Sequence, residues 1–327
     1  MAGPQLAPRP TFDCLWCGRS WTTRSADDLE GWAKLCPDCL GKAGDNAFLR
    51  FRLRDALAAR AGASQRATET AEPSEAIGQA ERIKQAGPTG SSPPRHETTP
   101  PADDVGAEMV AYYAARAGEY DDWYLRRGRY AHGPIHDAAW NAELDAAGRW
   151  LDALPIRGEI VELAAGTGWW SPLLASKGEL WLYDAAEAPL ERARERLLAH
   201  GLRAHIHLRD AWAEPDRSVD AVVLGFWLSH VDRDRTAASL DLARRWLKPG
   251  GTLAIIDSLA DPQSGADDHP PVVGDRATRR VADGREFTII KVHRDAAELD
   301  AALRAAGFGD VRVETSGRFF VLADAHA

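Results

Sequence analysis

The chain of 327 residues is long enough for more than one domain and for a sizeable hydrophobic core. Its formal net charge of -9 disfavours nucleic acid as a partner, because a phosphate backbone attracts basic surfaces. Hydrophobic residues make up 45% of the chain in runs too short to span a bilayer, and no secretory signal pattern opens it, so we expect a cytoplasmic protein that does not enter a membrane.

All four cysteines lie within residues 1–58, as two Cys-x-x-Cys pairs. Cys14 and Cys17 form the first pair, and Cys36 and Cys39 form the second. Four thiolates at this spacing suit a tetrahedral zinc ion, and the segment resembles a treble-clef or ribbon zinc finger. A pair of disulfides is disfavoured in a cytosolic chain, and a redox Cys-x-x-Cys is disfavoured because no βαβ pattern surrounds it. We therefore predict a small module that needs zinc to fold and that could also bind a protein partner.

Residues 59–104 have a different composition. They are rich in Ala, Ser, Thr, Glu, Gly and Pro and nearly free of aromatic residues. Such a segment cannot bury enough apolar surface to offset the entropy lost on ordering. We predict a flexible linker that leads into a second folded domain over residues 105–327.

The second domain is predicted to have an α/β fold. An amphipathic helix begins near Gly106 and includes Tyr113 and Tyr120, and a second helix covers 137–154. Strands and helices then alternate, which predicts a Rossmann-like, doubly wound parallel sheet followed by a helix and a C-terminal antiparallel hairpin. The predicted strands are 158–163, 179–183, 204–208, 220–225 and 252–257, the helices are 169–176, 187–200, 233–246 and 297–307, and the hairpin strands are 311–314 and 318–323. An insertion between Asp257 and His293 includes an alternating stretch, 285–293, that predicts a strand or hairpin near the active-site mouth.

A glycine turn joins the first of these strands to its helix. The turn runs from Glu162 to Gly168, and its glycines would let a ligand approach the backbone and the helix N-terminus. The dinucleotide fingerprint would require glycine where Ser171 stands, and no P-loop sequence is present. Asp184 ends the next strand, where a carboxylate can accept hydrogen bonds from both ribose hydroxyls. With no basic residue in the loop, we expect a nucleoside without phosphates.

These motifs resemble the class I S-adenosylmethionine-dependent methyltransferases of small-molecule type, close to methyltransferase domains 11 and 25. The Glu162–Gly168 turn matches the family's E/D-x-G-x-G-x-G loop, with Ala164 in place of the first glycine, which indicates a slightly different turn. The resemblance implies that S-adenosylmethionine is the cofactor, in addition to the zinc ion predicted from the cysteine spacing. It also implies these cofactor-binding residues: Glu162, Ala164, Gly166 and Gly168 in the loop, Asp184 at the ribose, Asp210 and Ala211 at the adenine, Phe226 after the fourth strand, and Tyr113 on a lid helix. An equally weighted alternative is that the tyrosines of that helix only pack on the sheet.

Methyl transfer by in-line displacement needs a positioned acceptor, and a base only if the acceptor atom carries a proton. His230 follows the fourth strand and is the first candidate for that base. Alternatively, it only hydrogen-bonds the loop. Asp257, His293 and Tyr113 are weaker candidates. No Asn/Asp-Pro-Pro-Tyr motif is present, which disfavours methylation of a base amine.

Three functions are compatible with these features. The first is methylation of a small molecule. The second is methylation of a protein or RNA that the zinc finger docks. The third is a non-catalytic cofactor-binding module, which the intact set of loop glycines and acids disfavours.

Overall fold

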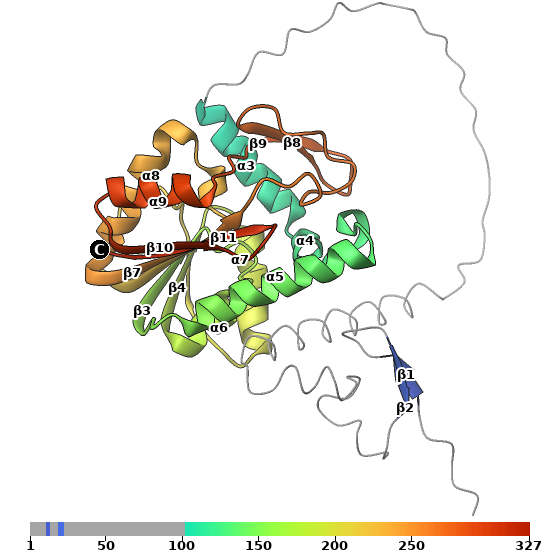
Figure 1. Ribbon diagram of the computed structural model, residues 1–327, viewed down its shortest axis with the longest axis horizontal. Helices are drawn as coiled ribbons and strands as arrows, with labels where there is room; N and C mark the ends of the chain where they lie inside the picture. The colour runs from blue at the N-terminus through green and yellow to red at the C-terminus, as the bar shows by residue number, and fades with distance from the viewer. Residues whose placement is uncertain (1–10, 14–18, 23–101) are drawn as a thin grey trace, which may run out of the picture. The chain divides into compact units, whose positions relative to one another are not determined.

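The computed structural model describes residues 11–13, 19–22 and 102–327 (Figure 1). Near the N-terminus, strands β1 (Thr11–Asp13) and β2 (Ser20–Thr22) pair antiparallel, with Phe12 opposite Trp21. The four cysteines of the predicted zinc finger and most of the predicted linker lie outside the described residues. Residues 102–327 form a compact unit separate from the one that contains β1 and β2.

A seven-stranded sheet forms the centre of the second unit, in the order β10-β11-β7-β6-β3-β4-β5 (Figure 1). Five strands are mutually parallel: β3 (Gly158–Leu163), β4 (Gly178–Asp184), β5 (His205–Leu208), β6 (Val219–Gly225) and β7 (Leu247–Ser258). The C-terminal hairpin adds β11 (Phe320–His326), antiparallel to β7, and β10 (Gly309–Thr315), antiparallel to β11. The predicted Rossmann-like sheet with a C-terminal antiparallel hairpin is confirmed.

Helices cover both faces of this sheet, because its central strands carry apolar side chains on each side. Ile160 and Val161 are both fully buried, yet Ile160 belongs to one apolar cluster and Val161 to the other. The first cluster contains side chains of α5 (Pro134–Ala153), α6 (Ser171–Lys177) and α7 (Glu187–Ala199). The second contains those of α8 (Thr236–Trp246) and α9 (Ala296–Ala305). The core is therefore a three-layer α/β/α arrangement.

The long helix predicted from Gly106 through Tyr120 is two helices. α3 (Ala102–Arg116) begins before residue 105 and ends ahead of Gly118, and α4 (Tyr120–Leu125) follows. The backbone N–H of Glu119 donates to the carbonyl of Arg116, a three-residue turn in place of the helical four-residue bond. Glycine has low helix propensity, which favours a break at this position.

The insertion before α9 forms a hairpin of its own, as the alternating stretch predicted. Strands β8 (Arg276–Arg280) and β9 (Glu286–Ile290) pair antiparallel, and Figure 1 shows them beside α3. Met109 and Tyr112 of α3 are buried with Ile289 of β9 in a third apolar cluster. The hairpin and α3 therefore form one packed layer of their own.

In the described part of the chain, no helix combines the length and apolar character that crossing a bilayer requires.

Candidate active site

The glycine turn after β3 has a left-handed backbone at three positions. Ala164 has a φ of 51°, Gly166 of 55° and Gly168 of 70°. Ala164 therefore has the left-handed conformation that glycine adopts easily. For alanine this conformation costs about 1–2 kcal/mol of free energy. Such strain is retained where the surrounding structure enforces it, which is common around ligand sites.

Asp184 at the end of β4 is held in place by this turn. One carboxylate oxygen accepts a hydrogen bond from the Gly166 N–H at 2.8 Å, and the other accepts from the Ala186 N–H at 2.9 Å. Burial raises the pKa of Asp184, and the two backbone donors oppose that rise. Each oxygen keeps a second acceptor site, so the carboxylate can still receive hydrogen bonds from two hydroxyls.

A cavity of about 350 Å³ lies at the carboxyl ends of β3, β4 and β6, where the strand order reverses. Eight of the predicted site residues line it: Tyr113, Ala164, Gly166, Asp184, Asp210, Ala211, Phe226 and His230. The lining also includes residues that the sequence analysis missed, among them Ala186, Trp212, Trp227 and Arg235. Trp212 could have been inferred from its place beside Asp210 and Ala211.

The acidic lining of this cavity fits S-adenosylmethionine, a nucleoside with a sulfonium and an ammonium group. Asp184, Asp210 and Asp232 line it, against Arg235, whose guanidinium lies 3.9 Å from the centre of the Trp212 ring. Asp210 is exposed, and one of its oxygens accepts from the Trp212 N–H at 2.8 Å. A pyrophosphate would instead call for several cations or helix N–H groups directed at it.

Glu162 and Gly168 belong to the same turn but do not line the cavity. Glu162 is only 1% exposed, and its carboxyl accepts a hydrogen bond from the Ser171 hydroxyl at 2.5 Å. Burial raises the pKa of Glu162 to about 8. A β-carbon on Gly168 would lie 2.7 Å from the β-carbon of Ala193 in α7. Both residues therefore support the turn from behind, whereas the sequence analysis expected them at the cofactor.

Gly168→Ala should consequently destabilise the fold more than Gly166→Ala does. Both positions have a positive φ, but a β-carbon at Gly166 meets its nearest neighbour, Tyr120, at an ordinary 3.6 Å. The extra steric conflict at Gly168 should cost about 1–3 kcal/mol. Urea denaturation of both variants measures the difference, and equal free energies of unfolding would contradict this packing role.

His230 lies at the end of the cavity and is almost fully buried. Its Nδ1 is 2.7 Å from the carbonyl oxygen of Ile290, and its Nε2 is 2.7 Å from the hydroxyl of Tyr113. A carbonyl only accepts, so Nδ1 donates, and Nε2 of the neutral ring accepts from Tyr113. Burial, with the nearby Lys291, holds the pKa of His230 well below its usual range. His230 is therefore a neutral imidazole paired with Tyr113.

A second cavity, of about 410 Å³, meets the first at four shared residues: Tyr113, Tyr120, Phe226 and His230. It is also lined by residues of α4, of the segment 258–272 and of the β8–β9 hairpin. Phe226 has a φ of 59°, an uncommon conformation for a bulky residue. The Tyr113–His230 pair thus lies where the two cavities join.

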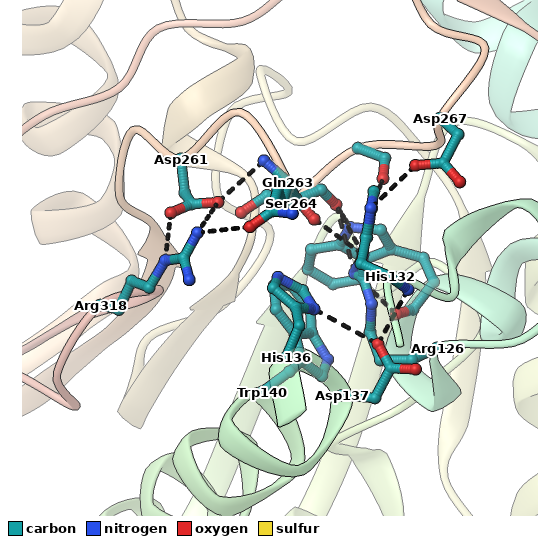
Figure 2. Close-up of polar contacts among 12 residues, drawn as sticks. Arg126, His132, His136, Asp137, Trp140, Asp261, Gln263, Ser264, Asp267 and Arg318 are labelled. Atoms are coloured by element: carbon teal, nitrogen blue, oxygen red, sulfur yellow. Dashed lines mark hydrogen bonds and ion pairs between the residues drawn. The ribbon is translucent and has the colours of Figure 1, made fainter. Parts of the chain in front are cut away.

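Long side chains fix one wall of the second cavity (Figure 2). Arg126 donates to the carbonyls of Gln263 and Ser264 at 3.1 and 3.2 Å, and the guanidinium of Arg318 faces the carboxylate of Asp261 at 2.5 Å. His132 adds a contact to the Gly265 carbonyl at 3.0 Å. The segment 258–272 is therefore held to the end of α4, to the residues that precede α5 and to the C-terminal hairpin.

Two of the weaker base candidates, Asp257 near the end of β7 and His293 after β9, differ in position. His293 lines the second cavity, and burial together with Lys291 and Arg279 lowers its pKa to about 4. Asp257 lines neither cavity, and its oxygens accept from the N–H groups of Ser229 and Ser258, each at 2.7 Å. Asp257 therefore orders the backbone beneath the site.

Comparison with known proteins agrees with this arrangement. Residues 160–251 match the family model described as a methyltransferase domain. The ubiquinone/menaquinone biosynthesis C-methyltransferase UbiE of Neisseria gonorrhoeae is 31% identical over 168 residues, which cover 47% of this chain and 67% of that protein. The structure of a DhpI–SAM–HEP complex superposes with a TM-score of 0.56 at 31% identity and covers 70% of this chain and 100% of that one. A DhpI–SAH complex superposes with a TM-score of 0.54 at 29% identity, over 69% of this chain and 98% of the other.

The sheet order, the acid-lined cavity beside the glycine turn and these similarities agree with one another. The chain belongs to the class I S-adenosylmethionine-dependent methyltransferases.

Proposed function

We propose that this enzyme transfers a methyl group to a small-molecule acceptor by in-line displacement. The observation that carries the proposal is the second cavity, whose volume of about 410 Å³ falls in the range that encloses small ligands. It joins the acid-lined cavity at Tyr113, Tyr120, Phe226 and His230, so a cofactor in one can face an acceptor in the other.

The residues that would hold S-adenosylmethionine follow from the geometry of the first cavity. Asp184 would accept from the ribose hydroxyls, and Asp210 would accept from the adenine amino group. Ala164 and Gly166 would give the ligand access to the backbone of the turn. When bound, the cofactor supplies a methyl group that its sulfonium already activates.

The Tyr113–His230 pair would position the acceptor at the junction. The Tyr113 hydroxyl donates to His230, so its oxygen remains free to accept a hydrogen bond from the group to be methylated. If that group carries a proton, the proton would reach His230 through Tyr113, because the other ring nitrogen of His230 is held by Ile290. The catalytic role first proposed for His230 alone is thus a role for the pair.

The similar proteins support a small acceptor. UbiE is named for ubiquinone and menaquinone biosynthesis, and the DhpI structure is a complex with SAM and HEP. The alternative is a protein or RNA substrate docked by the N-terminal cysteine module.

A labelling experiment distinguishes these functions. The full-length enzyme is incubated with methyl-labelled S-adenosylmethionine and an extract of the source cells, and the products are separated by size. We expect label in the small-molecule fraction with the wild type and none with Asp184→Ala. Label confined to protein or RNA would favour the docking alternative, and its absence from every fraction would oppose an enzyme.

We also propose that Cys14, Cys17, Cys36 and Cys39 bind one zinc ion. The first pair lies in sequence between the paired strands β1 and β2, which suits a zinc knuckle. Elemental analysis of the purified chain should find about one zinc per chain, and Cys36→Ser should lose it. His205→Ala, a change to an exposed histidine that pairs with Glu179, is the control. A full-length wild type without zinc after purification in zinc-containing medium would refute the proposal.

A further inference from the structure

The second cavity is lined by three basic side chains from separate elements. Arg116 comes from the end of α3, Arg279 from β8, and Lys291 follows β9. In the described part of the chain none of the three forms a salt bridge to a carboxylate, and their hydrogen bonds go to hydroxyl and carbonyl oxygens. Arg116 is buried, and Arg279 and Lys291 are half-buried. Removing unpaired charge from water is costly, so three such groups around one cavity need an explanation.

Arg116 is only 8% exposed and has unmet hydrogen-bonding capacity. Its Nη1 donates to the Tyr112 hydroxyl at 2.9 Å, but its Nε and Nη2 have no partner among the described residues. Rings of nearby tyrosines, the nearest with its centre 4.6 Å away, stabilise the charge in part. The buried hydroxyl of Tyr130, another lining residue, also has no partner among the residues described.

Lys291 and Arg279 are held mainly by neutral groups. The ammonium of Lys291 lies 3.0 Å from the Ser229 hydroxyl, and burial lowers its pKa to about 8, although the nearby carboxylate of Asp257 opposes that fall. Arg279 donates to the Thr278 carbonyl at 3.1 Å, and burial also lowers the pKa of Arg279. Neither contact neutralises the charge.

The one carboxylate in the described lining does not offset these charges. Asp261 is bound by Arg318 and by the backbone N–H of Gln263 (Figure 2). His269 and His293 also line the cavity, and for each the pKa falls to about 4, first through burial and then through the neighbouring cations. The cavity is therefore cationic, whereas the cofactor cavity next to it is acidic.

We propose that the methyl acceptor carries an oxyacid anion, a carboxylate or a phosphate-type group, which Arg116, Arg279 and Lys291 bind. This inference rests on the proposed function, because it assigns the second cavity to the acceptor. Guanidinium and ammonium groups form short, charge-assisted hydrogen bonds with such anions. The anion would anchor one end of the acceptor, and the atom to be methylated would lie towards Tyr113 and His230.

Anion binding to the full-length protein tests the proposal. The protein is saturated with S-adenosylhomocysteine and titrated by calorimetry with inorganic phosphate and with acetate, against chloride at matched ionic strength. We expect phosphate or acetate to bind, with affinity reduced about tenfold or more in Arg279→Met and Lys291→Met. The matched control is Arg285→Met on the same hairpin, because Arg285 is exposed and pairs with Asp283.

The same variants show whether Arg279 and Lys291 bind an anion or only stabilise the fold. Replacing an unpaired, half-buried cation by methionine should leave the melting temperature of the unliganded protein unchanged or higher, while the stabilisation by anion is lost. Phosphate binding with acetate excluded identifies a phosphate-type acceptor, and the reverse identifies a carboxylate.

Other outcomes overturn the inference. No binding of either anion, or equal binding in the variants and the wild type, would refute it while leaving the proposed function intact if S-adenosylhomocysteine still binds. A matching loss of S-adenosylhomocysteine affinity in Arg279→Met and Lys291→Met would assign the cations to the cofactor's own carboxylate. Failure of the wild type to bind S-adenosylhomocysteine would oppose the proposed function itself.

Discussion

Asp184→Ala should weaken S-adenosylmethionine binding by about 100-fold or more. The carboxylate is fixed by the N–H groups of Gly166 and Ala186 and would accept from two ribose hydroxyls. Hydrogen bonds to a charged group contribute about 1.5–3 kcal/mol each, and about 1.4 kcal/mol corresponds to a tenfold change in affinity. Calorimetry with the full-length protein measures this loss directly.

Two further variants make the result specific. Asp241→Ala removes an exposed acid on α8, outside the cavity lining, and should bind the cofactor as the wild type does. Asp184→Asn keeps the size of the side chain and one acceptor oxygen, so it should be impaired less than Asp184→Ala. Unchanged affinity in a folded Asp184→Ala would remove Asp184 from the cofactor site.

Glu162→Gln should remove the contribution that this carboxyl makes to the pH dependence of the free energy of unfolding. The pKa of Glu162 is about 8 in the folded protein against an ordinary value of 4.5, because burial penalises the carboxylate. The folded state therefore binds this proton more tightly than the unfolded state does. The stability that this group contributes is fully present below the ordinary pKa and is lost as the pH rises towards 8, by an amount on the order of a few kcal/mol.

Glutamine keeps the shape of Glu162 and can accept from the Ser171 hydroxyl, but it does not ionise. Urea denaturation of the wild type and Glu162→Gln at two pH values, about 5 and about 9, isolates the contribution of this group, since every other titration is shared. We expect the variant to be the more stable protein at the higher pH. An identical pH dependence in the two proteins would show that Glu162 remains ionised in the fold.

Much of the fold followed from local sequence patterns. The alternation of apolar strands and helices predicted the doubly wound sheet, because a strand covered on both faces is apolar throughout and each crossover needs a helix. The ends of the helices were predicted less accurately. The residues around Gly118 divide one predicted helix in two, and α8 begins at Thr236, whereas the predicted helix began at residue 233. Gly118 favours a break, but single glycines also occur inside helices, so the sequence did not decide between the two.

The cofactor cavity was predictable in part for a similar reason. The glycine turn and Asp184 each follow a strand, and the carboxyl ends of neighbouring parallel strands meet at one edge of the sheet. The positions of Glu162 and Gly168 could not be derived in this way. They lie in the same turn as Gly166, but their directions depend on α6 and α7, which pack behind it.

The second cavity depends on the tertiary structure. Tyr113 and His230 are separated by 117 positions in the chain, yet their side chains form a hydrogen bond. Arg116, Arg279 and Lys291 reach one cavity only because the β8–β9 hairpin packs on α3. Short motifs at the strand ends were therefore enough to predict the class of enzyme and the cofactor. The chemistry of the second cavity depends on contacts between distant segments, which no local pattern records.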